Sequence, residues 1–433
     1  MPKITIIGAG SHVFGVIHHA RMFLDVLSFP ELSESHIFLM DIDEKKLVLV
    51  EALAKKVLRD TGVGAKIEVT SDRRLALDGA DYVLTTIDVG GDYNADKGIP
   101  LKYGLDQSSA DTIGPGGVFK GLRTTPALLD MCEDMEELCP DALLMNYTNP
   151  MAICCWAMNR GTNIKNIGLC HSVEGTAHQL AGYIGAPTDE ISYWVAGINH
   201  MSWFLALRRN GENVYPALWA KLNNPEIFAK DTVRFEIMKH FGYFVTESSR
   251  HVSEYVPYFR QRRDLIEKYS LLISPPTSHF SREQRDQRYI KMMTEQIESK
   301  EKITLSRSRE YASSYIIHSI ETGVPRMVNA NVDNTGLVTN LPDGCCVEVP
   351  CVVDKTGIHP CHVGELPPQC AALNIANINM QRMAVKAILE KDRQAAFHAL
   401  ALDPLTSAVL QLEEIRKMFD EMFEAQAEYL GDF

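Results

Sequence analysis

The sequence predicts an α/β protein in which an N-terminal, Rossmann-like, doubly wound parallel sheet is followed by a C-terminal α+β domain. Short and almost continuously apolar segments alternate with helical segments through the first 170 residues, which is typical of a parallel sheet covered on both faces. A glycine turn directly follows the first apolar segment, as it does in doubly wound sheets. Beyond about residue 190 the alternation stops, and a hairpin-like pattern and long helical patterns replace it.

The apolar segments of the first part predict six strands. In chain order these are KITIIGA (3–9), HIFLMDID (36–43), KIEVTS (66–71), DYVLTTIDV (81–89), DALLMNYTN (141–149) and NIGLC (166–170). Between the second and third strands, residues 44–62 carry apolar side chains at intervals of three and four and end in glycine. This spacing predicts a helix that covers the sheet.

The second part has a different character. Residues 191–212 predict strands with a turn at Arg209–Gly211, whereas 283–320 and 371–431 read as mostly helical. We therefore expect two domains, a dinucleotide-binding domain over 1–190 and a substrate, metal and oligomerisation domain over 191–433. No clean linker separates them, so we expect an extensive shared interface. The proline-containing piece at 272–288 predicts a mobile loop or an oligomer contact.

Composition excludes several classes of protein. The formal net charge of −13 argues against a nucleic-acid partner, because phosphate backbones attract basic surfaces. No stretch approaches the roughly 20 apolar residues of a membrane helix, and the first residues lack the pattern of a signal peptide. Ten cysteines without a CxxC motif indicate reduced thiols, and hence a cytoplasmic protein, rather than a disulfide framework.

The turn after the first strand suggests a dinucleotide site. Gly8 permits a tight turn, and Gly10, followed by Ser11, lets the backbone approach a pyrophosphate. The third glycine of the usual GxGxxG pattern is absent, since Val13 holds that place and Gly15 comes two residues later.

An acid at the end of the second strand points to the form of the dinucleotide. Asp41 can accept hydrogen bonds from both ribose hydroxyls and would repel a 2′-phosphate, so NAD is favoured over NADP. Asp41 lies further from the glycines than the usual spacing of about 20 residues, which requires an extended first helix. Asp43 is the next candidate for this role.

A second group of residues suggests a metal site. Cys170 ends the sixth predicted strand and is followed by His171, and His200 lies about thirty residues on in GINHM. Thiolate and imidazole both bind borderline divalent ions, and the carboxyl ends of parallel strands are where such sheets place their sites. Taken singly, a cysteine or histidine is more often a packing residue. Their combination with a dinucleotide turn indicates hydride chemistry assisted by a metal.

With NYTNPM (146–151) added, the order of motifs resembles a known family. GAGS, LMDID, GPGG, LRT, NYTNP, GLCHSV, GINHM and ESSRHVSEYVPYF occur in the order found in glycoside hydrolase family 4, and the resemblance continues through SREYAS and NLPDGCCVEV. These enzymes are glycosidases that depend on NAD and a divalent metal, and they are an exception to hydrolysis by two carboxylates. CHSV together with YFVTESS is most similar to the α-galactosidase, or melibiase, branch.

The resemblance implies a reaction. NAD oxidises C3 of the sugar, the C2 proton is then removed, and the aglycone leaves by elimination. Water adds back, and NADH returns the hydride. The cofactors implied are NAD and Mn²⁺, with Cys170 and His200 matching the metal ligands. The substrate implied is an α-galactoside of the melibiose type, and a homodimer or homotetramer is expected on the same ground.

The resemblance also assigns roles to single residues. Tyr255 matches the tyrosine base, although a free tyrosine has a pKa near about 10, so we expect a nearby cation to lower it. His171 stands where phospho-α-glucosidases carry an aspartate acid, which makes it a candidate proton donor. Asn149 matches the substrate-binding asparagine, Asp111 falls near the sugar pocket, and Arg309 is a possible sugar contact.

Several alternatives stay open on the sequence. Within the family they are an α-glucosidase and an α-galacturonidase, which one or two pocket residues would separate from an α-galactosidase. From another class, an NAD-dependent hydroxy-acid dehydrogenase would fit the first domain, which resembles lactate and malate dehydrogenases. Those enzymes need no thiolate ligand, so the cysteine and histidine argue against this reading. A non-catalytic NAD-binding regulator is opposed by the presence of Cys170, His200 and Tyr255.

Overall fold

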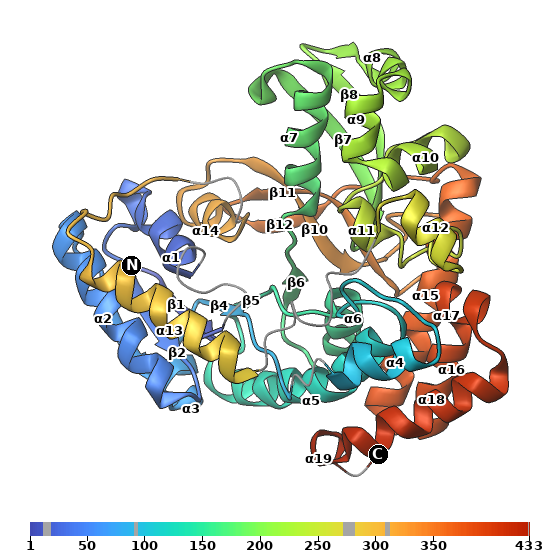
Figure 1. The fold of residues 1–433 in the computed structure, drawn as a ribbon. Coiled ribbons are helices and arrows are strands. Elements are labelled where there is room, and N and C mark those ends of the chain that lie inside the picture. Colours follow the sequence, from blue (N-terminus) through green and yellow to red (C-terminus); the bar gives the residue numbers. More distant parts are fainter. Residues whose placement is uncertain (12–18, 91–93, 272–281, 308–311, 432) are drawn as a thin grey trace.

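A single twisted sheet runs through the whole molecule (Figure 1). The computed structural model describes residues 1–11, 19–90, 94–271, 282–307, 312–431 and 433. The sheet has the order β3-β2-β1-β4-β5-β6-β10-β11-β7-β8-β9, and β12 pairs with β11. In chain order the strands are β1 (Lys3–Ile7), β2 (His36–Met40), β3 (Lys66–Thr70), β4 (Tyr82–Thr85), β5 (Leu143–Asn146), β6 (Asn166–Gly168), β7 (Ile191–Ile198), β8 (Met201–Arg209), β9 (Glu212–Asn213), β10 (Arg326–Asp333), β11 (Cys346–Asp354) and β12 (Gly357–Pro360).

Helices flank this sheet and extend it at one end (Figure 1). The α-helices are α1 (His19–Leu27), α2 (Glu44–Thr61), α3 (Arg73–Leu77), α4 (Ile99–Lys102), α5 (Gly114–Leu138), α6 (Met151–Gly161), α7 (Ser172–Ile184), α8 (Tyr215–Ala220), α9 (Pro225–Lys230), α10 (Thr232–Phe241), α11 (Ser249–Val252), α12 (Arg263–Lys268), α13 (Arg282–Glu298), α14 (Ala312–Thr322), α15 (Pro368–Glu390), α16 (Arg393–Leu402), α17 (Pro404–Val409), α18 (Leu412–Ala425) and α19 (Ala427–Leu430). Shorter helical turns are η1 (Pro30–Leu32), η2 (Asn94–Gly98), η3 (Thr188–Glu190) and η4 (Lys221–Asn223).

The first six strands confirm the predicted fold class. They are all parallel, and their order 3-2-1-4-5-6 is that of a Rossmann sheet. Burial on both faces explains why five of them read as almost continuous apolar runs, whereas the edge strand β3 is only partly buried and reads KIEVT. The predicted helix at 44–62 is α2, in which Asp43 accepts hydrogen bonds from the backbone of Lys45 and Lys46 at the start and Gly62 adopts a left-handed conformation at the end.

The remaining strands join the same sheet in antiparallel fashion. Asn331 of β10 pairs with Gly168 of β6, and Glu348 of β11 pairs with Gly197 of β7. The chain therefore returns from residue 326 onward to lie beside the parallel strands, so strands from both halves of the chain form one continuous sheet.

Two details of the second half differ from the sequence-based expectations. The turn predicted at Arg209–Gly211 joins β8 to β9, but the tighter turn of the hairpin lies at Asn199–His200, between β7 and β8. Residues 282–288 form the start of α13, which contradicts a loop there and agrees with the helical pattern expected from residue 283 onward, and 272–281 lie outside the described residues. Among the described residues, none of the helices combines the length and the apolar character needed to cross a bilayer.

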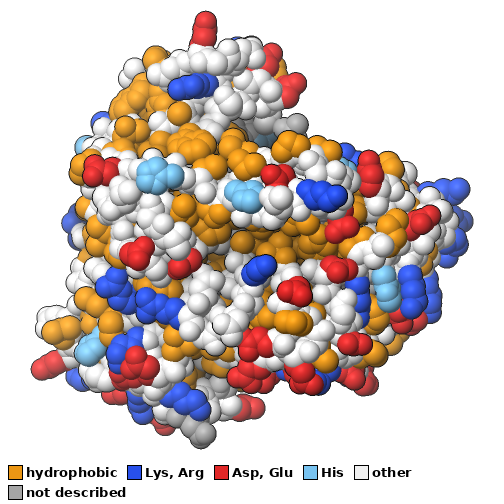
Figure 2. Space-filling model, turned by 180° about the vertical axis from the view of Figure 1, so that it is seen from behind, with side chains coloured by type: hydrophobic (Ala, Val, Ile, Leu, Met, Phe, Trp, Pro, Cys, Tyr) orange, Lys and Arg blue, Asp and Glu red, His pale blue; other side chains and the backbone are white. Residues whose placement is uncertain are grey.

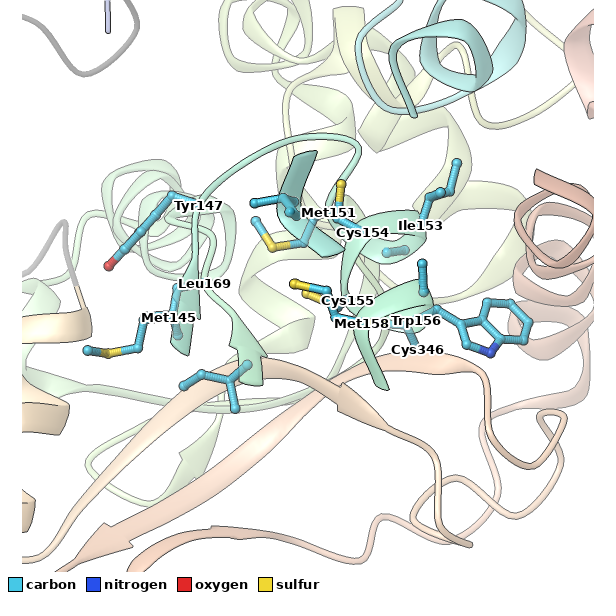
Figure 3. Close-up of a cluster of buried hydrophobic side chains, with 14 of the residues drawn as sticks. Met145, Tyr147, Met151, Ile153, Cys154, Cys155, Trp156, Met158, Leu169 and Cys346 are labelled. Atoms are coloured by element: carbon cyan, nitrogen blue, oxygen red, sulfur yellow. The ribbon is translucent and has the colours of Figure 1, made fainter. Parts of the chain in front are cut away.

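The core has two parts. The larger one surrounds α6, whose Ile153, Cys155 and Trp156 are completely buried and pack near Cys346 of β11 (Figure 3). All ten cysteines are free thiols, as the sequence predicted. A smaller cluster lies within a lobe formed by α7–α10 with β7 and β8. Figure 2 shows hydrophobic side chains gathered beneath that protruding lobe, with charged side chains scattered over the remaining visible surface.

Candidate active site

The glycine turn after β1 has the geometry that a dinucleotide needs. Gly8 has φ +90°, and a Cβ there would lie 2.9 Å from the backbone of Thr86, so a side chain is excluded. The backbone NH groups of Gly8 and Ala9 both donate to the carbonyl of Met40 at the end of β2, over 2.9 Å. The turn is closed by the NH of Ser11, which donates to the carbonyl of Gly8. Val13 and Gly15 lie outside the described residues.

The two acids after β2 have different surroundings. Asp41 Oδ2 accepts a hydrogen bond of 2.7 Å from the backbone NH of Gly10, so its carboxylate lies directly at the glycine turn. Asp43 instead caps α2 and lies 3.5 Å from the ammonium of Lys46. The structure therefore favours Asp41 over Asp43 as the acid that faces a bound dinucleotide.

Three side chains of types that can bind a metal ion meet at the junction of the parallel and antiparallel strands. The donor atoms of Cys170, His200 and Glu247 all lie within 4.8 Å of one another. Cys170 follows β6, His200 occupies the turn between β7 and β8, and Glu247 precedes α11. His200 and Glu247 have φ values of +63° and +73°, a left-handed backbone that only a few per cent of non-glycine residues adopt. Such positions cluster at functional sites.

The electrostatics of these three residues favour a bound cation. Burial, together with the nearby carboxylates of Glu247 and Glu348, raises the pKa of the Cys170 thiol. Burial alone would also raise the pKa of Glu247, but His200, His251 and His171 hold it below its usual range. A divalent ion would deprotonate the thiol and offset the repulsion between thiolate and carboxylate.

A buried acid lies behind the three donors. Glu348 of β11 is completely buried, and its Oε2 accepts a hydrogen bond of 2.7 Å from the hydroxyl of Ser202. Burial raises its pKa to about 7. Its other oxygen, Oε1, has no hydrogen-bond partner among the described residues.

Tyr255 belongs to a chain of hydrogen-bonding groups that reaches His200. Its hydroxyl donates to Thr112 Oγ1 over 2.9 Å, and the same oxygen lies 2.8 Å from Nε2 of His251. That Nε2 is 3.3 Å from Nδ1 of His200. Burial, together with Asp111, Glu247 and Glu254, raises the pKa of Tyr255 well above its usual value. This direction is opposite to the lowered pKa that was expected from the sequence.

Asp111 and Asn149 form a polar pair beside these residues. Asn149 Nδ2 donates to Asp111 Oδ2 over 3.2 Å. Asp111 Oδ1 and Asn149 Oδ1 are both buried and have no partner within the described part of the chain. Burial would raise the pKa of Asp111, but His251, Lys120 and His200 hold it below its usual range. A buried carboxylate and amide with free acceptor oxygens are suited to binding the hydroxyl groups of a ligand.

Glu254 stabilises the loop that carries Asp111 and Thr112. Glu254, which is completely buried, accepts hydrogen bonds from the backbone NH groups of Ser108, Ser109 and Ala110 at 2.8, 2.7 and 3.1 Å. Because Glu254 immediately precedes Tyr255, the same short segment fixes both the tyrosine and the loop that carries its hydrogen-bond partner.

His171 occupies a more open position. It is the N-terminal capping residue of α7, and its side chain is exposed, in contrast to the buried His200 and His251. It directly follows Cys170 in the chain. Arg309, the possible sugar contact, lies outside the described residues.

The sequence reasoning missed several members of this site. Glu247 and His251 lie within the quoted ESSRHVSEY segment, and Thr112 follows Asp111, but none was given a role. The closeness of an acid, a histidine and a tyrosine in one segment was a usable signal. Asn199, whose buried Nδ2 lacks a partner among the described residues, is a further candidate, since it directly precedes His200.

Comparison with known proteins agrees with this geometry. The Family 4 glycosyl hydrolase profile matches residues 3–186, and the profile of the C-terminal domain of the same family matches 195–406. An α-galactosidase of Bacillus subtilis is 42% identical over the full length of both chains. An α-galactosidase of Rhizobium meliloti is 38% identical, covering all of this chain and 89% of the relative.

A solved structure extends the comparison to the fold. A 6-phospho-α-glucosidase from gut microorganisms, in complex with NAD and Mn²⁺, has a TM-score of 0.82 and covers 98% of each chain at 20% identity. The likeness at this identity concerns the fold. The two profiles and the full-length relatives show that the chain belongs to family 4 of the glycosyl hydrolases.

Proposed function

We propose that this protein is an α-galactosidase that hydrolyses melibiose-like α-galactosides with the help of NAD and Mn²⁺. The observation that carries the proposal is the meeting of Cys170, His200 and Glu247 beside Tyr255 and the Asp111–Asn149 pair. Full-length identity to two proteins named α-galactosidase supports the choice of sugar.

The residues present fit both cofactors. The thiol, the imidazole and the carboxylate offer three donor atoms to a divalent ion, a set open enough to leave positions for substrate oxygens. The Gly8 turn allows close approach of a pyrophosphate, and Asp41 at the same turn suits the ribose of NAD. Asp111 Oδ1 and Asn149 Oδ1, which have no partner among the described residues, offer acceptors for sugar hydroxyls.

When bound, NAD supplies reversible hydride transfer and the metal ion supplies Lewis-acid polarisation. The polypeptide supplies the proton chemistry and the positioning. Asp111 and Asn149 bind hydroxyl groups and orient the sugar. Tyr255 would accept the proton from C2 as the tyrosinate, after its own phenol proton has been lost, and Thr112 Oγ1, which accepts a hydrogen bond from the Tyr255 hydroxyl, holds that oxygen in place. His171 donates a proton to the leaving oxygen from the open side of the site.

Two rivals of the same family differ in the sugar. An α-glucosidase would have to accept the opposite configuration at C4, and an α-galacturonidase would have to bind a carboxylate at C6. A hydroxy-acid dehydrogenase is disfavoured, because such an enzyme uses no cluster of thiol, imidazole and carboxylate and would accumulate NADH.

Organisation and location belong to the same proposal. Residues 1–190 bind NAD, and 191–433 contribute to the substrate and metal site and to oligomerisation. We place the enzyme in the cytoplasm as a homodimer or homotetramer. The ten free thiols support a reducing compartment.

The test is hydrolysis of p-nitrophenyl α-galactoside under reducing conditions, with NAD and Mn²⁺ added singly and together. The matching α-glucoside and α-galacturonide serve as comparison substrates. We expect turnover of the galactoside only with both additives and without accumulation of NADH. Faster turnover of another sugar would reassign the specificity. Inactivity on all three, with NADH formed from a hydroxy acid, would contradict the proposal.

A further inference from the structure

His251 lies beside both the candidate metal site and the candidate base. It belongs to α11, four residues after Glu247 and four before Tyr255, and only 8% of it is exposed. Its ring packs edge-on against that of His200, with centroids 4.6 Å apart, and lies 5.7 Å from the ring of Tyr255. The hydroxyl of Ser248 caps this helix by accepting a hydrogen bond from the backbone NH of His251, which fixes the backbone that carries the ring.

The orientation of the His200 ring defines what His251 can do. Nε2 of His200 faces Glu247, 3.6 Å from Oε2, and Nδ1 faces His251 Nε2 at 3.3 Å. A neutral imidazole that binds a cation through Nε2 carries its proton on Nδ1. His251 Nε2 is then placed to accept a hydrogen bond from this Nδ1–H. A hydrogen bond of this kind fixes the tautomer and the orientation of a metal-binding histidine.

The same nitrogen of His251 also faces the hydroxyl that holds Tyr255. His251 Nε2 lies 2.8 Å from Thr112 Oγ1, and this oxygen accepts the hydrogen bond from the Tyr255 hydroxyl at 2.9 Å. Because Thr112 Oγ1 accepts from Tyr255, its own proton can point towards His251. One imidazole nitrogen thus meets the metal-binding histidine on one side and the support of the base on the other.

We propose that His251 is a positioning residue for both parts of the site. It orients His200 towards the divalent ion, and through Thr112 it orients the hydroxyl of Tyr255. The inference rests on the metal site of the proposed function and adds that metal binding and proton abstraction depend on one shared side chain. A change at His251 therefore affects both, whereas a change at Thr112 affects only the tyrosine.

The first experiment measures Mn²⁺ binding to the complete protein by electron paramagnetic resonance, without NAD or substrate. His251→Gln and His251→Asn form a matched pair, because the amide of glutamine reaches the position of Nε2 and that of asparagine reaches only the position of Nδ1. Loss of a group that supports a metal ligand costs 10–100-fold in affinity. We expect the Kd to rise at least about tenfold in His251→Asn and to stay near that of the unmodified protein in His251→Gln.

A second readout separates the two parts of the site. Thr112→Val keeps the shape of the side chain and removes its hydroxyl, so the Kd for Mn²⁺ should not change. With NAD and saturating Mn²⁺ bound, exchange of the substrate C2 proton with deuterated water should slow about two- to tenfold in this variant, as for the loss of one hydrogen bond. His251→Asn should slow the exchange to a similar extent.

His318→Asn is the control for the loss of a buried imidazole. His318 is 5% exposed, and its ring packs on Phe29 and lies 2.8 Å from a guanidinium nitrogen of Arg326. This variant should change neither the Kd for Mn²⁺ nor the exchange rate. If thermal unfolding shows that His251→Asn does not fold, His251→Leu, which also lacks a group at the position of Nε2, takes its place in the comparison.

An unchanged Kd in His251→Asn, or the same rise in His251→Asn and His251→Gln, would overturn the inference. A raised Kd in Thr112→Val, or undiminished C2 exchange in that variant, would overturn the division of roles on which it depends. Failure of the proposed function is distinguishable, because the unmodified protein would then bind no Mn²⁺ or would catalyse no C2 exchange.

Discussion

The imidazole Nε2 of His200 lies 3.6 Å from the Glu247 carboxylate Oε2, and both residues hold left-handed backbone conformations to reach this position. Together with Cys170 they form a set of donors that no single sequence motif contains. Because the carboxylate adds a negative charge to a half-buried thiol site, it should contribute strongly to cation binding.

Replacing Glu247 by glutamine should therefore weaken Mn²⁺ binding. Loss of groups that only support a metal ligand costs 10–100-fold in affinity, so we expect at least about a tenfold increase in Kd. Mn²⁺ titration followed by electron paramagnetic resonance, without substrate or NAD, measures this directly. Glu236→Gln, on α10, is the control. An unchanged Kd would show that Glu247 does not bind the ion.

Asp41→Ala should weaken NAD binding and reduce the preference for NAD over NADP. The carboxylate lies at the glycine turn, where it faces the expected ribose. Asp43→Ala is the matched comparison, because it removes the cap of α2 and should cost about 1 kcal/mol of stability without changing the Kd for NAD. Calorimetric titration of both variants, with thermal unfolding, separates the two effects. The opposite pattern would assign the ribose to Asp43.

Cys170→Ser should abolish hydrolysis while the fold and NAD binding persist. Cys361→Ser is the control, since Cys361 is also partly exposed but lies on the segment that follows β12. Circular dichroism and NAD titration would confirm that both variants fold. Full activity of Cys170→Ser would rule out the thiolate as a ligand.

Chemical modification gives an independent view of the same thiol. Burial and two carboxylates raise the pKa of Cys170 in the metal-free chain, so the protonated form dominates at neutral pH. Alkylation by iodoacetamide should be slow at pH 7 and should accelerate as the pH rises, because only the thiolate reacts. Bound Mn²⁺ should protect Cys170, and a chelator should restore its reactivity. Rapid alkylation of the metal-free protein at pH 7, mapped to Cys170, would contradict the raised pKa.

Sequence reasoning predicted the parallel half of the fold because all of its strands except the edge strand β3, which is only partly buried, are largely buried on both faces. A segment such as HIFLM (36–40) carries a strong local signal of this kind. The antiparallel strands β10 to β12 were not assigned. The segment of β10, RMVNANVD, mixes polar and apolar residues. Its partner in β6 lies more than 150 positions earlier in the chain, and its partner β11 lies beyond the turn that follows β10. No local pattern encodes such partners.

The candidate site, too, was only partly predicted from the sequence. Cys170 and His200 were predicted as metal ligands because thiolate and imidazole bind divalent ions, because each follows or joins a predicted strand, and because both match ligand positions of the family that the sequence resembles. Glu247 and Thr112 were missed because their importance depends on three-dimensional neighbours. Thr112 is 143 residues from its partner Tyr255 in the chain, and only the folded loop held by Glu254 brings the two together.

Tyr255→Phe should lower kcat by 10²–10⁴, the usual contribution of a positioned general base, because the variant keeps the ring but loses the hydroxyl bound to Thr112. Exchange of the C2 proton of the substrate with deuterated water should be lost in parallel, and Mn²⁺ binding should persist. Tyr258→Phe, at an exposed neighbour (44% exposed), is the control. Since burial and three carboxylates raise the pKa of Tyr255, the free enzyme without metal should show no tyrosinate absorbance from this residue up to pH 9. Retained C2 exchange in Tyr255→Phe would transfer the role of base to another group, of which His251, 2.8 Å from the same Thr112 oxygen, is the nearest candidate.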